Sequence, residues 1–354
     1  MKITWRWYGE DNDSITLADI KQIPNISGIV WSLHNKKAGD SWQSEEIDKV
    51  ATLIKNYGFN CDVVESVNIH DEIKTGGIER DHYIDIYIDT IEKLSKVGVK
   101  VICYNFMPVF DWIRTDLFRE LPDGSNALFY EKNKVTRNYQ EVIDLILKGG
   151  NGYTMPGWEP ERLNEIEKLF TKYEDVTDEK LFNNLIYFLQ KIGPICKACN
   201  IKMAIHPDDP PFSVFGLPRI INSYENINKL LTKIPEEYNG LTLCTGSLGS
   251  TSENDLLKII DDFHKRIYFT HIRNIKRFSN GDFIEVSHYT SDGDVDITNI
   301  IKKYYQKDYQ YYIRPDHGRH IWGEENFCRP GYGLYDRALG IMYFNGIIDA
   351  LESE

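Results

Sequence analysis

The sequence predicts an α/β fold, a single (β/α)8 TIM barrel, and two observations carry this prediction. Short apolar segments rich in β-branched and aromatic residues alternate along the chain with longer segments whose apolar residues recur at helical spacing. Eight β-then-α units of this kind fit into 354 residues, which is the pattern of a (β/α)8 barrel. Because α/β barrels often use this many residues in one domain, we expect residues 1–354 to form a single domain.

The eight expected strands are short and apolar, and polar or turn residues follow them. In chain order they are ITWRWYG (3–9), GIVWSLH (28–34), CDVVESV (61–67), KVICYNFMP (100–108), KMAIHPD (202–208), GLTLCTG (240–246), IYFTHIRN (267–274) and YYIRPDHG (311–318). Helices fit between most of them, because apolar residues recur there at helical spacing. The clearest helical segments are 44–58, 81–98, 178–199, 223–234 and 252–266, and a last helix closes the chain at 333–353.

Two segments are too long to be simple connections between a strand and a helix. Residues 109–180 contain helical runs at 134–149 and 158–174, separated by a Gly-Asn-Gly break, and predict an inserted helical cap after strand 4. Residues 274–293 contain an Asn-Gly pair, a strong hairpin signal, and predict a β-hairpin insertion after strand 7. Both insertions follow strands, so we expect them at the carboxyl ends of the barrel strands, where barrel active sites lie.

The composition limits the partners and the compartment of this chain. A net charge of -13 argues against nucleic-acid binding, which needs a basic surface. The start of the chain has no signal-peptide core, and no apolar run approaches the roughly 20 residues of a membrane helix, so we expect no membrane partner. Six cysteines in a chain of this length do not suggest a disulfide framework, so we expect a reducing cytoplasm. The Cys196-x-x-Cys199 pair ends a predicted helix, and we interpret it as ordinary packing.

Four potential metal ligands stand at the ends of four consecutive predicted strands. They are His206, Cys244, His271 and Asp316, from the fifth to the eighth strand. Strand ends of a barrel converge on one mouth, so four such side chains can surround one ion. Each residue also has a structural interpretation, since a histidine can be hydrogen-bonded, a cysteine packed and an aspartate placed to cap a turn. Two imidazoles, a thiolate and a carboxylate suit Zn²⁺, Fe²⁺ or Mn²⁺ and disfavour Mg²⁺.

Four arginines near the strand ends suggest an acidic substrate. They are Arg6, Arg273, Arg314 and Arg319, and arginine binds carboxylates through paired hydrogen bonds. Each could instead pair with one of the many acidic side chains of the protein.

Further polar residues surround the same predicted mouth. His34 and Asn105 end or follow strands and are expected to contact the substrate. His317 follows the proposed ligand Asp316, and Tyr332 lies between two glycines that permit a tight backbone. Both His317 and Tyr332 can carry protons.

Long segments of the chain resemble the mannonate dehydratase family, metal-dependent barrel enzymes related in fold to xylose isomerase. The matching segments are KQIPNISGIVWSLHN, VVESVNIHDEIKTG, RDHYIDIYIDTI, VICYNFMPVFDWIRTDL, AIHPDDPP, LCTGSLG, FTHIRN, DGDVD, RPDHGR and RPGYGLYDRALGIMY. The resemblance implies conversion of D-mannonate to 2-keto-3-deoxy-D-gluconate and water, in glucuronate catabolism. It also implies a Mn²⁺ or Fe²⁺ cofactor and a dimer or larger homo-oligomer.

The resemblance implies the same site residues. The family's metal ligands fall on His206, Cys244, His271 and Asp316, and positions linked to catalysis fall on His317 and Tyr332, without saying which is acid and which is base. The main alternative is another divalent-metal sugar isomerase or sugar-acid dehydratase on the same barrel. A barrel without enzymatic activity is a further alternative, and it predicts no transition metal.

Overall fold

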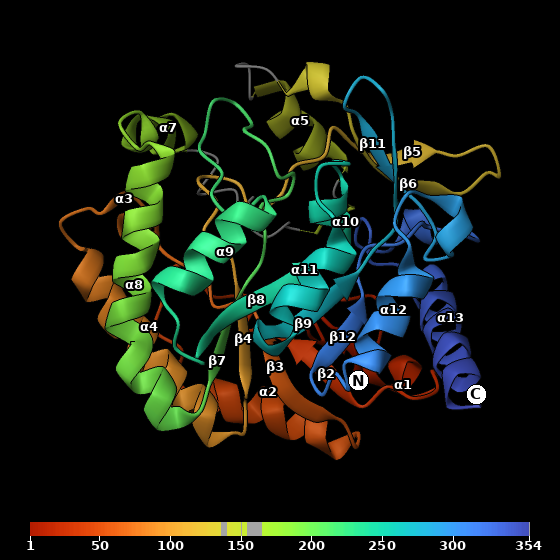
Figure 1. The fold of residues 1–354 in the computed structure, drawn as a ribbon, viewed down its shortest axis with the longest axis horizontal. Coiled ribbons are helices and arrows are strands. Elements are labelled where there is room, and N and C mark those ends of the chain that lie inside the picture. Colours follow the sequence, from red (N-terminus) through yellow and green to blue (C-terminus); the bar gives the residue numbers. More distant parts are fainter. Residues whose placement is uncertain (136–139, 150, 154–164, 354) are drawn as a thin grey trace.

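Eight parallel strands close into a barrel, which confirms the predicted fold class (Figure 1). The structure is a computed structural model and describes residues 1–135, 140–149, 151–153 and 165–353. Neighbouring strands follow the order β1-β12-β9-β8-β7-β4-β3-β2 around the barrel. Each predicted strand contains one of these: β1 (Lys2–Arg6), β2 (Gly28–Trp31), β3 (Asn60–Glu65), β4 (Val101–Tyr104), β7 (Lys202–Ile205), β8 (Asn239–Cys244), β9 (Ile267–Ile272) and β12 (Tyr312–Pro315).

Helices surround the barrel, and every helix named from the sequence outside the cap is present. They are α1 (Leu17–Ile20), α2 (Ser44–Asn56), α3 (Asp71–Thr75), α4 (Arg80–Lys96), α8 (Asp178–Cys199), α9 (Tyr224–Lys233), α10 (Thr245–Gly249), α11 (Leu256–Phe263), α12 (Ile297–Gln306) and α13 (Tyr335–Glu352). Helix α11 starts four residues later than predicted, because the Asp255 side chain caps it by accepting a hydrogen bond from the Lys258 amide. None of the helices in the described part of the chain is long and apolar enough to cross a membrane.

Two buried layers hold the barrel together. The larger apolar cluster lies between the strands and the surrounding helices. A second cluster includes Val63, Val101, Phe269 and Tyr312, which point to the barrel interior. Because side chains alternate along a strand, the residues two positions further along also point inward. These next residues are Glu65, Cys103, His271 and Arg314, so the polar site lies directly on top of the apolar interior.

The segment after β4 differs from the predicted helical cap, because it also contains strands. Strands β5 (Asp116–Glu120) and β6 (Asn126–Tyr130) form an antiparallel hairpin around a Pro-Asp-Gly turn, a sequence signal that the helical interpretation overlooked. The helical part comprises α5 (Gln140–Gly149) and α7 (Ile166–Tyr173). The predicted helical runs at 134–149 and 158–174 are therefore found in part, and their residues 136–139 and 158–164 lie outside the described residues.

The hairpin predicted after the seventh barrel strand is confirmed. Strands β10 (Ile275–Arg277) and β11 (Phe283–Glu285) pair in antiparallel fashion. β11 also pairs with β6, so the two insertions join in one four-stranded sheet of order β10-β11-β6-β5. Figure 1 shows this small sheet and α5 together at one end of the barrel, far from α2 at the other end. The two insertions therefore stabilise each other across the sequence.

The two glycines of α13 should respond in opposite ways to the same substitution. A Cβ on Gly340 would lie 2.7 Å from Cγ of the buried His288 ring, whereas a Cβ on Gly346 would meet nothing within 4 Å. We expect Gly340→Ala to lower the free energy of unfolding by about 1–3 kcal/mol through overpacking. Gly346→Ala should raise it by about 0.5–1 kcal/mol, because alanine favours the helix.

Urea unfolding of both variants measures the difference, and each serves as the control for the other. Equal effects of the two substitutions would contradict the packing of His288 against α13.

Candidate active site and metal centre

The register of the barrel strands brings polar side chains to one level of the mouth. Cys244 in β8 lies opposite His271 in β9, and His271 lies opposite Arg314 in β12. On the other side, Glu65 in β3 lies opposite Cys103 in β4. Since the strands are parallel and their inward positions are aligned, these groups converge although they are far apart in the sequence.

The four predicted metal ligands lie close together. Nε2 of His206 is 3.1 Å from Nδ1 of His271, and Sγ of Cys244 is 3.6 Å from Oδ2 of Asp316. The same Asp316 oxygen lies 4.0 Å from Nδ1 of His271. Donor atoms of His206, Cys244 and His271 are all within 4.8 Å of one another. Donors about 2.0–2.3 Å from one ion lie roughly 3.3–3.8 Å apart in a tetrahedral site. The 3.6 Å separation lies within this range and the 3.1 Å and 4.0 Å separations lie close to it, so small side-chain shifts would bring the donors around one divalent ion.

Two carboxylates of the mouth are held ionised by arginine. Burial works to raise the pKa of Asp316, but the Arg314 guanidinium 2.8 Å away outweighs it and holds that pKa well below its usual range. Burial also opposes ionisation of Glu65, and Arg314 at 3.0 Å, together with His271, holds the pKa of this carboxyl well below normal. Oε2 of Glu65 lies 3.4 Å from Nε2 of His271. Both carboxylates therefore remain negatively charged and available to cations.

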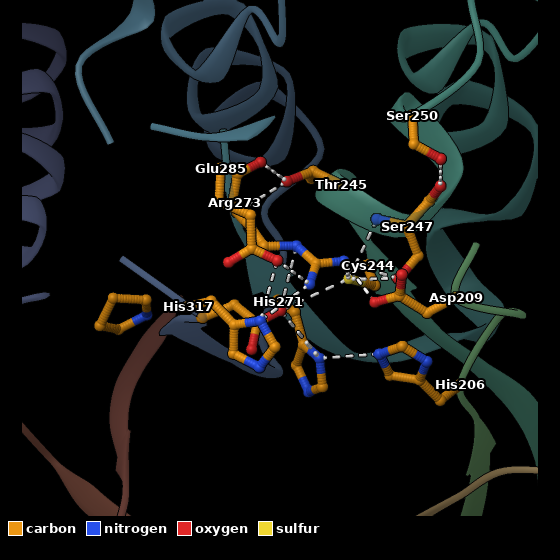
Figure 2. Close-up of polar contacts among 12 residues, drawn as sticks. His206, Asp209, Cys244, Thr245, Ser247, Ser250, His271, Arg273, Glu285 and His317 are labelled. Atoms are coloured by element: carbon orange, nitrogen blue, oxygen red, sulfur yellow. Dashed lines mark hydrogen bonds and ion pairs between the residues drawn. The ribbon is translucent and has the colours of Figure 1, made fainter. Parts of the chain in front are cut away.

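Arg273 connects the donor cluster to a second group of buried charges (Figure 2). Its guanidinium donates to Asp209 at 2.7 Å, to Glu285 at 3.1 Å and to Ser247 at 2.9 Å, and it lies 3.4 Å from Sγ of Cys244. Gly246 makes this approach possible, because a Cβ there would lie only 1.9 Å from Nε of Arg273. The guanidinium therefore depends on the absence of a side chain at this position.

Arg114 completes this group from the segment before β5. It donates to Asp209 at 2.9 Å and to Glu285 at 2.7 Å. Two buried arginines thus face two buried carboxylates. Burial opposes the charge of Glu285 and Asp209, but the positive partners of these groups hold both pKa values below normal.

His317 and Tyr332 meet at the edge of the donor cluster. Their rings are 4.7 Å apart in an edge-to-face arrangement, and the Trp112 ring lies 5.7 Å from His317. Gly331 has a φ of +78° and brings its backbone against the imidazole, where a Cβ would be 3.1 Å from Cγ of His317. Burial raises the pKa of Tyr332 well above its usual value, and the nearby Tyr8 raises it to a smaller extent. Tyr332 therefore keeps its proton at neutral pH.

A cavity opens onto these groups. Most predicted site residues line it, namely Arg6, Asn105, His206, His271, Arg273, Arg314, Asp316, His317 and Tyr332. Cys244 lies beneath it in the donor cluster and is fully buried.

Two predicted substrate contacts do not reach this cavity. Arg319 pairs with Asp123 at 2.7 Å and with Asp336 at 3.0 Å, because its strand has ended and the chain has turned toward α13. His34 packs against Tyr8, with the ring centres 4.8 Å apart, and Tyr8 rather than His34 lines the cavity. Burial and the nearby Arg6 lower the pKa of His34 well below its usual value, so the imidazole is neutral.

Arg6 differs from the other two arginines that line the cavity. Arg273 and Arg314 are engaged by protein carboxylates. Nε and Nη1 of Arg6 are buried and have no hydrogen-bond partner in the described part of the structure. A buried guanidinium with free donors is costly unless a ligand satisfies it. Arg6 is therefore the best-placed group for an anionic substrate.

Sequence reasoning missed four charged residues of the site. Glu65 ends a barrel strand as the chosen ligands do, so the same strand-end signal could have identified it. Asp209 stands three residues after His206 and could have been suspected from that position. Arg114 and Glu285 lie in the two insertions, and no local pattern distinguishes them. Only the pairing of β6 with β11 brings these two residues together.

The fold and the donor cluster together define a class of protein, (β/α)8-barrel enzymes with a candidate metal centre at the carboxyl ends of the strands. A family model described as D-mannonate dehydratase (UxuA) matches residues 1–354. The mannonate dehydratase of Endomicrobium trichonymphae is 56% identical over 353 residues, covering 99% of this chain and 96% of that protein. This chain therefore belongs to the D-mannonate dehydratase family, and the resemblance inferred from its sequence is confirmed.

Solved structures agree with this assignment. The mannonate dehydratase from Streptococcus suis serotype 2 has a TM-score of 0.88 at 39% identity, covering 99% of this chain and 94% of that chain. A xylose isomerase domain protein from Planctomyces limnophilus has a TM-score of 0.58 at 8% identity, covering 100% of this chain and 99% of that chain. This second similarity concerns the fold alone.

Proposed function

We propose that this protein dehydrates D-mannonate to 2-keto-3-deoxy-D-gluconate and water. The observation that carries the proposal is one cavity that joins the four-donor cluster, the proton carriers His317 and Tyr332, and the unsatisfied guanidinium of Arg6. Membership of the D-mannonate dehydratase family over the whole chain supports the same reaction. A sugar isomerase is not favoured, because an aldose has no carboxylate for Arg6 to bind.

We propose that His206, Cys244, His271 and Asp316 hold Mn²⁺ or Fe²⁺. The support is the mixture of imidazole, thiolate and carboxylate donors and their separations. When bound, such an ion supplies positive charge beside the substrate carboxylate as negative charge builds up there.

The two proton carriers can share the chemistry. Dehydration breaks the C2–H bond, delivers that proton to a base, and protonates the C3 hydroxyl so that it leaves as water. The enol that remains takes a proton at C3 and becomes the 2-keto acid. A tyrosine, with an ordinary pKa of about 10, carries its proton at neutral pH, and burial raises the pKa of Tyr332 further, so we assign Tyr332 as the group that protonates the leaving hydroxyl. His317 then accepts the C2 proton.

Arg6 would bind the carboxylate of the substrate. Nε and Nη1 of Arg6 have no hydrogen-bond partner among the described residues, whereas Arg273 lacks one only at Nε, and arginine forms paired hydrogen bonds with a carboxylate. Such contacts place C2 and C3 in a constant position relative to His317 and Tyr332. Asn105 also lines the cavity and can contact hydroxyl groups of the sugar chain.

We also propose a cytoplasmic role in hexuronate catabolism, with a small sugar acid rather than nucleic acid or a membrane as the partner. All six cysteines are free, which suits a reducing compartment. The net charge of -13 would repel nucleic acid.

A homo-oligomer is proposed from an exposed apolar surface beside α13. Trp322 is 75% exposed and its ring lies 5.3 Å from that of Tyr335. Leu339 and Met342 follow on the same face of the helix and are about half exposed. A group of exposed apolar side chains of this kind is typical of a protein contact.

Light scattering tests this surface. We expect a mass at least twice the 41.2 kDa of one chain, and Leu339→Glu should reduce it because a charge cannot be buried there without a partner. A single-chain mass for the unmodified protein would contradict the proposal.

The reaction is tested by removing the metal with a chelator and restoring it. The chelated protein should form no 2-keto-3-deoxy acid from D-mannonate, and Mn²⁺ should restore product. His317→Ala and Tyr332→Phe should retain the metal but lose turnover by roughly 10²- to 10⁴-fold.

A panel of aldoses is the control for the alternative reaction. Isomerisation of an aldose by the reconstituted protein, without dehydration of D-mannonate, would overturn the proposed function.

Substitution of Arg6 tests carboxylate binding. Arg6→Met keeps an unbranched stem and removes the guanidinium, and we expect KM for D-mannonate to rise by roughly 10- to 100-fold, the usual effect of losing a hydrogen bond to a charged group. Arg319→Met is the matched control, because this arginine lies outside the cavity. A larger effect at Arg319 than at Arg6 would contradict the assignment.

A further inference from the structure

Glu285 contacts His317 but has no role in the proposed reaction as described above. It is the last residue of β11, in the hairpin insertion, and its carboxylate is fully buried. Oε1 of Glu285 lies 3.0 Å from Nδ1 of His317. Figure 2 shows Glu285 and His317 on the same side of Arg273.

The charge of Glu285 is already balanced without the histidine. Arg114 and Arg273 each contact both Glu285 and Asp209, so two positive charges face two negative charges. Both arginines contact Oε1 of this carboxylate, whereas Oε2 is buried and has no hydrogen-bond partner in the described part of the structure. The additional contact with His317 is therefore available to orient the imidazole.

Nδ1 of His317 has two neighbours, and they favour opposite tautomers. Oε1 of Glu285 can only accept a hydrogen bond, whereas Nη1 of Arg273, at 3.1 Å, can only donate one. Nη1 of Arg273 also donates to Oε1 of Glu285 at 3.1 Å, so its proton has an acceptor without the imidazole. An unprotonated Nδ1 would instead place its lone pair against a carboxylate oxygen. A proton on Nδ1 that is donated to Glu285 avoids this repulsion.

The imidazole is also held against rotation. Trp112 and Tyr332 pack edge-to-face with it, and the Gly331 backbone lies against its inner edge. If the ring flipped, a carbon atom would take the place of Nδ1 beside Oε1 of Glu285. This oxygen would then lose its hydrogen bond from the imidazole. Packing and hydrogen bonding therefore select the same orientation.

We infer that Glu285 is a positioning residue that accepts the Nδ1 proton of His317 and leaves Nε2 unprotonated toward the cavity. An unprotonated Nε2 is the form that can accept the C2 proton, so this inference rests on the proposed function and deepens it. It also explains the hairpin insertion after β9. The hairpin lies outside the barrel and pairs with β6. Its Glu285 carboxylate orients His317, which lies in the loop after β12. The carboxylate–histidine pair is a general means of fixing a tautomer.

Nitrogen chemical shifts of ¹⁵N-histidine-labelled protein report the tautomer directly. The Zn²⁺-loaded protein is suitable, because Zn²⁺ is diamagnetic, and His317→Ala assigns the signal. We expect a protonated Nδ1 and an unprotonated Nε2. In Glu285→Ala, Arg273 becomes the remaining neighbour of Nδ1 and donates to it, so the proton should move to Nε2. Glu285→Gln keeps an acceptor oxygen and should keep the original tautomer.

Asp209→Asn is the matched control. It removes a carboxylate from the same two arginines without touching His317, so the tautomer should not change. In kinetics, Glu285→Ala should lower kcat by about 10- to 100-fold with a smaller change in KM, and Glu285→Gln should recover part of the loss.

A proton on Nε2 of His317 in the unmodified protein would overturn the inference, as would an unchanged kcat in Glu285→Ala. The inference would also be overturned if Asp209→Asn shifted the tautomer as much as Glu285→Ala does. The shift would then come from the loss of one negative charge in the buried cluster and not from the contact between Glu285 and His317. The nitrogen spectrum needs no substrate. A protonated Nδ1 in a protein that does not dehydrate D-mannonate would therefore refute the proposed function and leave the positioning role intact.

Discussion

Mutual neutralisation of buried charges is the constraint on which the mouth of the barrel depends. Arg114, Arg273 and Arg314 have almost no contact with solvent, and each is paired with carboxylates from other elements. Removing one member of such a group leaves its partner charged and buried, at a cost of about 3–5 kcal/mol. The charged side chains therefore stabilise the mouth only as a set, and each depends on several segments of the chain being in place.

This dependence explains the two insertions. Arg114 comes from the segment after β4 and Glu285 from the hairpin after β9, and they reach each other because β6 and β11 pair. The insertions therefore contribute charged side chains to the site as well as covering the barrel mouth. Glu285 lies in their small sheet and Arg114 lies two residues before it, at positions that the barrel strands alone do not reach, and Glu285 contacts His317.

Reactivity in the cavity depends on groups that the charge network leaves unsatisfied. Arg273 and Arg314 are occupied by protein carboxylates, and Asp316 is held ionised beside them. Nε and Nη1 of Arg6 have no hydrogen-bond partner in the described part of the chain, and Tyr332 carries a proton whose pKa burial raises further. A substrate that brings a carboxylate and hydroxyl groups would complete the hydrogen bonding of the site. The same network that stabilises the protein therefore leaves a small number of groups for binding and proton transfer.

The sequence by itself determined the barrel, its eight strands and the strand-end side chains proposed as ligands, because hydrophobic periodicity and strand ends are local features that parallel closure brings to one mouth. It also indicated the β10–β11 hairpin, whose Asn-Gly turn is a local signal. Only the tertiary structure decided that Arg319 turns away toward Asp336, that Nε and Nη1 of Arg6 have no hydrogen-bond partner among the described residues, and that Glu285 reaches His317. These outcomes depend on which buried charges meet across distant segments, and no local pattern of residues encodes such pairings.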